Sequence, residues 1–131
     1  MFLLDTNTLI YFFKGQGKVA DHLFATSPAE VAISAVSFYE IEVGIAKCAQ
    51  PAKRRRQFDS FLAVVSVLPL DRAAARAAAT ARADLEKRGL QMGPLDNLIA
   101  GIALAHRATI VTRNAREFSR LPGLPLVDWY D

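Results

Sequence analysis

Short apolar runs alternate with longer amphipathic segments along this chain. Met1–Leu4, Val31–Ser34, Val64–Leu68 and Ala108–Val111 are apolar at almost every position. Strands without polar alternation are typical of a sheet that is covered on both faces. The pattern therefore predicts short buried strands, with Leu126-Val127 as the last of them.

The segments between these strands carry helical spacing and residues that begin or end helices. Asn7 or Thr8 can cap a first helix that ends at Gly15. Further helices are predicted at Lys18–Thr26, at Val36–Lys47, from Pro51 onward, at Asp71–Arg88, at Pro94–His106 and at Ala115–Ser119. Because strands and helices alternate, we expect an α/β fold of three α/β/α layers with a central, mainly parallel sheet. No repeat or linker interrupts it, so residues 1–131 are expected to form a single domain.

Composition supports a folded chain and narrows its location. Hydrophobic residues make up 52% of the 131 residues and charged residues 22%, which is typical of globular proteins. Cys48 is the only cysteine and cannot form an internal disulfide, so it is interpreted as a small apolar residue. The apolar start lacks a basic leader, and no apolar stretch reaches the roughly 20 residues that span a bilayer. We expect a cytoplasmic protein without a membrane partner.

Two acids stand where ligands bind in a parallel sheet. Asp5 directly follows the first strand, and ligands bind beyond the carboxyl ends of such strands. Asp96 is the third residue of the helix that begins at Pro94, at a positive helix end. Each acid has a plain alternative role in stabilising a helix N-terminus.

A third acid comes from the helix at Val36–Lys47. Glu40 and Glu42 are two residues apart and point to roughly opposite sides of that helix, so only one can join a shared site. Apolar residues surround both. Ser37 and Gly44, which permit close approach, share a side with Glu40 and favour it.

Neutral oxygens follow the strand that ends at Val111. Thr112 and Asn114 lie at the carboxyl edge of the sheet, either to hold water at a metal or simply as a polar turn, and Glu117 lies one helical turn further on. Carboxylates that gather need a balancing charge, and hard cations such as Mg²⁺ or Mn²⁺ choose oxygen ligands. Such ions activate water and stabilise a leaving oxygen, so the acids indicate phosphodiester chemistry.

Other kinds of site lack their required residues. His22 and His106 lack the spacing of zinc ligands, and no glycine-rich phosphate loop or nucleophile elbow is present. The net charge of +3 gives weak support for a polyanionic partner, with ordinary solubility as the alternative.

Four blocks in order resemble the PIN-domain nucleases, and within them the VapC-type toxins of bacterial toxin–antitoxin pairs. The blocks are Leu3–Asn7; Ile33-Ser34 with Glu40-Ile41 and Gly44; Asp96 with Ile99-Ala100; and Ile110–Asn114 with Glu117-Phe118. The segment from Leu124 to Trp129 is similar to the usual tail of these toxins. The resemblance thus covers nearly the whole chain and selects Glu40 over Glu42.

This resemblance implies a PIN-like endoribonuclease that cleaves RNA and so inhibits translation. It implies that Asp5, Glu40 and Asp96 bind Mg²⁺ or Mn²⁺, with Asn114 at a fourth catalytic position that is often aspartate in the broader family. It also implies a homodimer inhibited by a VapB-like antitoxin, whose C-terminal segment packs over the active site and whose other domain binds operator DNA. Lys14, Lys53–Arg56 and Arg113 are candidate contacts for RNA phosphates.

Three alternatives make different demands on the sequence. A haloacid-dehalogenase-like phosphatase needs a second aspartate where this chain has Asn7. A response-regulator receiver domain needs an aspartate after its third strand, where Pro69-Leu70 come first. A catalytically inactive PIN-like binding module is the third alternative, and it has no need to keep all three acids.

Overall fold

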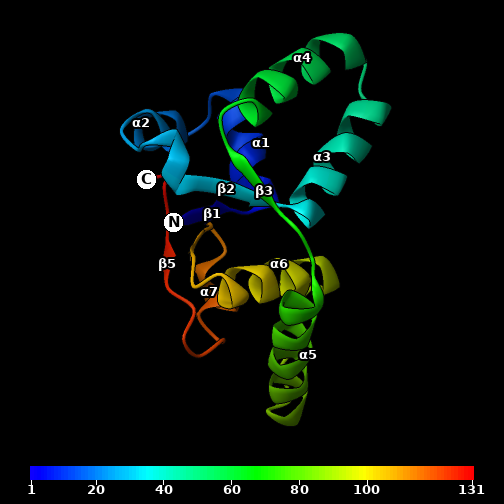
Figure 1. The fold of residues 1–131 in the computed structure, drawn as a ribbon, viewed down its shortest axis with the longest axis vertical. Coiled ribbons are helices and arrows are strands. Elements are labelled where there is room, and N and C mark those ends of the chain that lie inside the picture. The colour runs from blue at the N-terminus through cyan, green and yellow to red at the C-terminus, as the bar shows by residue number, and fades with distance from the viewer.

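The computed structural model describes residues 1–131, with five strands in one parallel sheet of order β3-β2-β1-β4-β5 (Figure 1). The strands are β1 (Phe2–Leu4), β2 (Val31–Ser34), β3 (Ser66–Leu68), β4 (Thr109–Val111) and β5 (Leu126–Val127). Every neighbouring pair is parallel. The predicted α/β class with a central parallel sheet is confirmed.

Helices cover both faces of this sheet. In Figure 1 the first four α-helices lie above the sheet and the last three lie below it. They are α1 (Thr6–Lys14), α2 (Val19–Phe24), α3 (Ala35–Lys47), α4 (Pro51–Leu62), α5 (Arg72–Lys87), α6 (Pro94–Ala105) and α7 (Ala115–Phe118), with a 3₁₀ turn, η1 (Pro28–Glu30), before β2. None of these helices is long and apolar enough to span a bilayer.

Two apolar clusters explain why the strands show no polar alternation. Successive strand residues point to opposite faces of a sheet. Leu3 and Ile110 accordingly pack in the cluster under α5 and α6, whereas Leu4 and Ile33 pack in the cluster under α1, α3 and α4. Both sides of each central strand are therefore buried.

Two local expectations needed correction, and one short element was not expected. The third strand begins at Ser66 rather than Val64, because the turn that ends α4 includes Val64, whose N–H donates to the carbonyl oxygen of Phe61 at 3.2 Å, and Val64 remains 59% exposed. Helix α1 begins at Thr6, so its N-cap is Asp5 and not Asn7 or Thr8. The turn η1 was not predicted from the sequence.

The strand order creates a switch point between β1 and β4. From β1 the chain moves outward through β2 and β3, and then α5 and α6 carry it back to β4 on the other side of β1. Leu4 pairs with Val111, so Asp5 and Thr112 leave the sheet side by side. Open parallel sheets bind ligands in the crevice at such a reversal.

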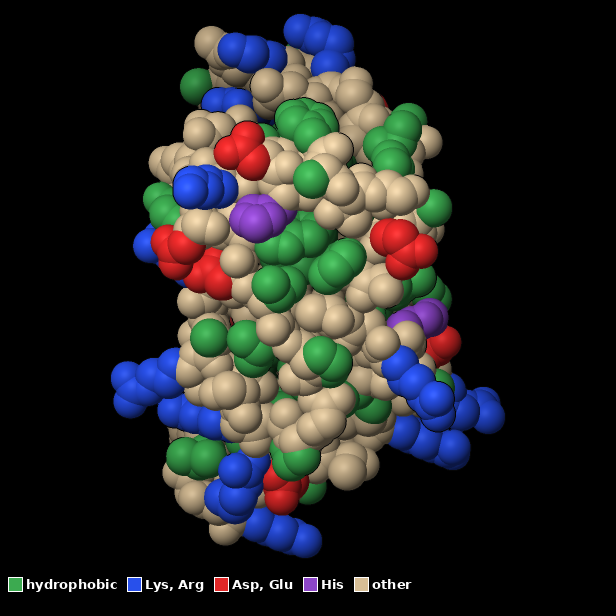
Figure 2. Space-filling view, turned by 90° about the vertical axis from the view of Figure 1, so that its left-hand side faces the viewer, with side chains coloured by type: hydrophobic (Ala, Val, Ile, Leu, Met, Phe, Trp, Pro, Cys, Tyr) green, Lys and Arg blue, Asp and Glu red, His purple; other side chains and the backbone are tan.

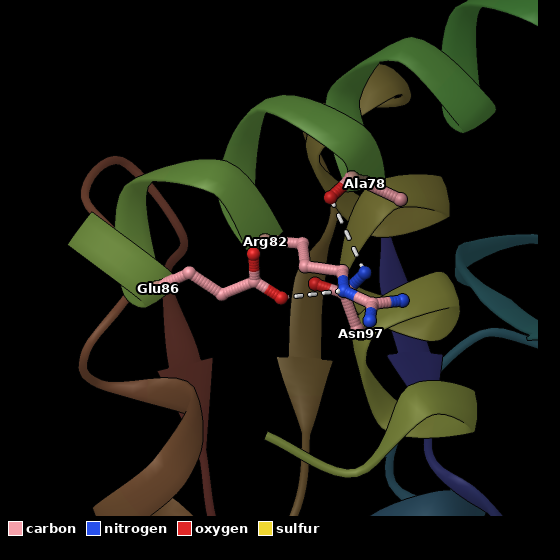
Figure 3. A network of polar contacts seen from close by, with 4 residues as sticks. All are labelled: Ala78, Arg82, Glu86 and Asn97. Carbon is pink, nitrogen blue, oxygen red and sulfur yellow. Dashed lines mark hydrogen bonds and ion pairs between the residues drawn. The ribbon is translucent and has the colours of Figure 1, made fainter. Parts of the chain in front are cut away.

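Helix α6 is held close against α5. A Cβ atom at Gly101 would lie 2.5 Å from Cβ of Ala78 and 2.6 Å from the carbonyl oxygen of Ala74, so only glycine permits this approach. The side-chain amide of Asn97 donates to the carbonyl oxygen of Ala78 at 3.2 Å (Figure 3). Both contacts fix α6, and the bond from Asn97 does so next to Asp96.

Candidate active site

Asp5 is the most buried acid at the carboxyl edge of the sheet. Its side chain is 4% exposed, and both of its oxygens accept hydrogen bonds. The backbone N–H of Thr8 donates to Oδ1 at 2.8 Å, and the hydroxyl of Thr112 donates to Oδ2 at 2.7 Å. Burial nevertheless raises the pKa of Asp5, because the bonds from Thr112 and Thr8 offset that effect only in part.

A chain of buried hydroxyls orients Glu40. The hydroxyl of Thr6 donates to Oε1 of Glu40 at 2.7 Å. A hydroxyl has one proton to give, so Ser37, whose Oγ lies 2.9 Å from that of Thr6, must be the donor in their contact. Ser34 in turn donates to Ser37 at 3.3 Å. Side chains from β2, α3 and α1 therefore direct one carboxylate oxygen of Glu40.

Asp96 is half-buried at the first turn of α6, and it carries the clearest electrostatic signature in the molecule. Burial raises its pKa from 3.8 to about 6, with further contributions from the negative charges of Asp5, Glu117 and Glu40. Asp5 directly follows β1, and the other acids come from α3, α6 and α7; Asp5, Glu40 and Glu117 lie close enough to Asp96 to disfavour its negative charge. No salt bridge neutralises any of them.

The turn after β4 closes the remaining side of the cluster. Thr112 is fully buried, and besides binding Asp5 its hydroxyl accepts the backbone N–H of Asn114 at 2.9 Å. The amide of Asn114 donates to Oε2 of Glu117 at 3.0 Å. Asn114 therefore shapes the turn and orients Glu117, and its side-chain hydrogen bond is to that acid rather than to Asp5.

The donor set fits a hard divalent cation. All candidate donors are oxygens, and burial together with the charges of Asp5, Glu117 and Glu40 raises the pKa of Asp96, while no salt bridge to a basic side chain balances these acids. No group of three or more His, Cys, Asp or Glu side chains stands close enough together to hold a metal ion by itself. An open arrangement suits Mg²⁺, because this ion keeps several waters and needs only one or two protein carboxylates.

Other residues singled out in the sequence lie outside this cluster. Glu42, the alternative to Glu40, forms an ion pair with Arg55 of α4 at 2.9 Å. The ring of His22 stacks on that of Trp129, and His106 is exposed at the end of α6. Cys48 ends α3 and lines an apolar groove.

The sequence reasoning missed two groups of contacts. In the sequence, Ser37 stands out only by its small size and Thr6 only as part of a motif. Neither residue predicts the hydroxyl chain to Glu40. The contact of Arg113 with Tyr130, whose ring centre lies 3.6 Å from the guanidinium carbon, was also not expected. Nothing in the spacing signals either contact, because each joins segments far apart in the chain.

Positive charge is distributed over more than one part of the surface. On the face that carries α2 and β5, Lys and Arg side chains gather toward the two ends of the molecule, and most Asp and Glu side chains lie between them (Figure 2). The basic run Lys53–Arg56 is exposed on α4, while Arg113 is exposed directly beside Asn114. Of these, Arg113 is the cation placed nearest in sequence to the acid cluster.

Comparison with known proteins shows which protein family this chain resembles. The PIN domain family matches residues 2–124. The tRNA(fMet)-specific endonuclease VapC of Salmonella typhimurium is 34% identical over 128 residues, which cover 98% of this chain and 97% of the relative.

Solved structures show the same fold. A chain in the crystal structure of DNA-bound VapBC from Salmonella typhimurium matches with a TM-score of 0.91 and 32% identity, covering 98% of this chain and 97% of that one. A chain of VapBC2 from Rickettsia felis, bound to a DNA fragment from its promoter, gives 0.90 and 30% identity with 98% coverage of both.

Proposed function

The chain belongs to the VapC ribonucleases of the PIN-domain family, and on that premise we propose that Asp5, Glu40 and Asp96 form its metal-dependent catalytic site. One observation carries the proposal. Four acids that repel one another gather at the switch point of the sheet, without a basic partner, and the pKa of Asp96 is raised to about 6. Such a cluster is costly unless a cation completes it.

The three acids have different surroundings and hence different parts in the proposed site. Asp5, with both oxygens already hydrogen-bonded, is the fixed member. Glu40 is oriented through Thr6, and its second oxygen Oε2 accepts no hydrogen bond from the protein. Asp96 is the acid whose ionisation depends on the cation. Asn114 contributes by holding Glu117 and the turn.

The oxygen-only donor set favours Mg²⁺ or Mn²⁺ as the resident ion. When bound, such an ion supplies a Lewis acid that activates water and stabilises charge at the scissile phosphate. The protein's own contribution is to hold Asp5 and Glu40 in position through Thr8, Thr112 and Thr6 before substrate arrives. Outer hydrogen bonds of this kind orient metal ligands.

The proposed substrate is RNA, cleaved at an internal phosphodiester bond to inhibit translation. The relative from Salmonella typhimurium is described as specific for tRNA(fMet), so this tRNA is the first substrate to test. Purified protein should cleave it with Mg²⁺ or Mn²⁺ and should stop when EDTA is added. Asp5→Asn and Asp96→Asn should each lower kcat by about 10²-fold or more, the range for loss of a residue essential to the chemistry.

Two substitutions on α3 distinguish the loss of a catalytic residue from the loss of any negative charge. Glu40→Gln should remove activity, whereas Glu42→Gln should leave it near that of the unaltered protein because Glu42 pairs with Arg55 on the surface. Equal rates for Asp5→Asn and the unaltered protein would refute the proposed site. Tight RNA binding without cleavage under any metal would instead favour the catalytically inactive binding module.

An apolar groove next to Glu40 supports a protein partner as well. The groove has a volume of about 290 Å³ and lies between α1, α3 and α4, with Ile10, Phe13, Ile41, Ile45 and Phe58 along its apolar walls and Glu40 on its polar part. We infer that the C-terminal segment of a VapB-like antitoxin occupies this groove and covers the site. Lys14 and Arg54, which also line it, would attract acidic residues of that segment.

The assembly proposed for this chain follows the complexes that match its fold. Both of those structures are described as VapBC complexes with DNA. We propose that this chain forms a homodimer, joins its antitoxin in a larger complex, and reaches operator DNA only through the antitoxin. Light scattering of the purified chain, alone and with antitoxin, measures the first two points directly.

A further inference from the structure

A second hollow, which shares no lining residue with the apolar groove, opens at Asp5. Its volume is about 310 Å³, and its lining is polar apart from one aromatic ring: Asp5, Asn7, Tyr11, Arg113 and Asn114. The hollow therefore shares Asp5 with the proposed catalytic site but draws its other walls from α1 and from the turn after β4. It has the size and polarity to receive part of a polar ligand.

Arg113 is the cation of this hollow, and the protein supplies no acceptor for it. The guanidinium forms no hydrogen bond and no salt bridge, although Asp5 lines the same hollow. It rests instead on the face of Tyr130, with its carbon 3.6 Å from the ring centre. Stacking on an aromatic face holds a guanidinium while leaving its N–H donors, at the edge of the plane, free for an anion.

Tyr130 is anchored independently of Arg113. Its ring meets that of Tyr11 edge-on with centres 5.0 Å apart, and it packs so closely on Gly17 that a Cβ there would lie 2.7 Å from the ring. Its backbone N–H donates to Asp128 at 2.8 Å, and its carbonyl oxygen accepts the N–H of Lys18 at 2.7 Å. The ring is thus a fixed platform for a long and otherwise mobile side chain.

We propose that this hollow binds a backbone phosphate of the RNA through Arg113, and that Tyr130 is the residue that positions Arg113 for it. This inference rests on the proposed ribonuclease function, because it assigns a substrate contact to that same site. Arginine forms paired hydrogen bonds with phosphate oxygens, and an arginine that is held in place loses less entropy on binding. Asp5, the one carboxylate of the hollow, repels a phosphate, and Arg113 supplies the positive charge that attracts it.

Kinetics at several salt concentrations test the assignment. Arg113→Ala should raise KM about tenfold, as expected for loss of a charged hydrogen bond. It should also flatten the dependence of log KM on log salt by about 0.7, the value per phosphate contact on a single strand. Arg116→Ala removes the same charge three residues away, outside the hollow, and should leave the KM and salt slope near those of the unaltered protein.

Substitutions of Tyr130 test whether its ring affects KM by positioning Arg113. Tyr130→Leu should raise KM by about threefold with little change in kcat, as expected for loss of one cation–π contact. Tyr130→Phe retains the ring and should restore KM. In the Arg113→Ala background, Tyr130→Leu should add no further rise, because its effect passes through the missing guanidinium. A further rise of equal size would show that the tyrosine acts only on the fold and would overturn its assigned role.

The outcomes separate this inference from the proposed function. Active enzyme whose salt slope is the same with and without Arg113 would overturn the phosphate assignment and leave the ribonuclease proposal standing. The opposite result is a protein that never cleaves RNA but, after EDTA treatment, binds a short single-stranded RNA in an Arg113-dependent manner. That result would support the phosphate assignment and overturn the ribonuclease proposal. Fluorescence anisotropy with that oligonucleotide provides this second measurement.

Discussion

At the scale of single residues, the site is built from acids whose charges oppose one another. Asp5 is held by two hydrogen bonds, Glu40 by a chain of hydroxyls, and Asp96 by neither. Burial raises the pKa of both Asp5 and Asp96, but only Asp5 has hydrogen bonds that offset part of the effect. The Asp96 pKa of about 6 means that near neutral pH the folded, metal-free protein bears a charge that burial and the other acids disfavour.

This raised pKa gives a pH-dependent stability. Between pH 3.8 and about 6 the folded state keeps a proton on Asp96 that the unfolded state releases, so stability falls as the pH rises through this window. In EDTA, Asp96→Asn should raise the Tm at pH 8 by about 3 °C, the size expected for one modest stabilising change. The gain should vanish near pH 4.

Calorimetry across this pH range, with Asp59→Asn as control, measures the effect. Asp59 is an exposed acid of α4 that makes no side-chain hydrogen bond or salt bridge, so its variant should show no such pH dependence. With saturating Mn²⁺ the unaltered protein should have a higher Tm than Asp96→Asn, because the ion stabilises the protein that retains the carboxylate. A gain for Asp96→Asn that persists unchanged to pH 4 would contradict the electrostatic explanation.

At this scale, the charged residues of the site were easier to predict from the sequence than the residues that contact them. Asp5 and Asp96 stood out because each lies at a predicted element boundary. Glu40 and Glu42 could not be separated firmly by periodicity, and the family resemblance chose between them. Thr6 and Tyr130 gave no such signal, because a hydroxyl or ring acquires its role only from side chains that the fold brings next to it.

At the scale of elements, the contact between α5 and α6 determines where Asp96 stands. Gly101 lets α6 touch α5, and Asn97 hydrogen-bonds across the contact (Figure 3). Gly101→Ala should destabilise the protein by about 1–3 kcal/mol, the usual cost of overpacking, because its new methyl group would overlap Ala78. The small gain in helix propensity from alanine offsets only part of this cost.

A second helical glycine provides the control for this prediction. A Cβ at Gly44 of α3 meets nothing within 4 Å, so Gly44→Ala should stabilise the protein by about 0.5–1 kcal/mol. Urea denaturation of both variants compares them on the same scale. Equal stabilities would mean that the two helices separate easily, and the position of Asp96 would then need another explanation.

The element boundaries that were predicted wrongly have clear physical causes. The residues Val64 and Val65 are β-branched and suited the predicted strand, yet β3 lies at the edge of the sheet and begins only at Ser66. Likewise Asp5 caps α1 through the N–H of Thr8, so the helix begins earlier than the polar turn suggested. The turn that ends α4 decides the first boundary, and the local hydrogen bond from Thr8 to Asp5 decides the second.

At the scale of the whole molecule, the proposed antitoxin groove and the proposed catalytic site share Glu40. The class of sheet was predictable because its buried strands and their helices follow a local pattern. The order of the strands was not, since it depends on which face α5 and α6 cover. That order is what brings Thr112 to Asp5, and it also places the apolar groove beside the acids.

Because the groove and the site meet at Glu40, we predict that a substitution elsewhere in the groove blocks inhibition by the antitoxin without removing toxicity. Expression of the chain should arrest growth, and Asp5→Asn or co-expression of the cognate antitoxin should restore it. Gly44→Leu would project a side chain into the groove from an exposed position, so it should retain the arrest but resist rescue by antitoxin. Colony counts after induction measure both properties.

Ala46→Leu is the matched control for this experiment. It adds similar apolar bulk at an exposed position two residues further along α3, but Ala46 does not line the groove. Rescue should therefore proceed as it does for the unaltered chain. Normal rescue of Gly44→Leu would show that the antitoxin does not use this groove.

The hydrogen bond between Thr112 and Asp5 joins residues 107 positions apart, and the ring under Arg113 comes later still. During translation, Asp5 and Glu40 leave the ribosome long before the segment with Thr112 and Tyr130 has been made. The nascent chain therefore carries the first two acids without the strand that completes their site. The ribonuclease, whose proposed substrate is a tRNA, is in this way kept incomplete while it is still attached to a ribosome.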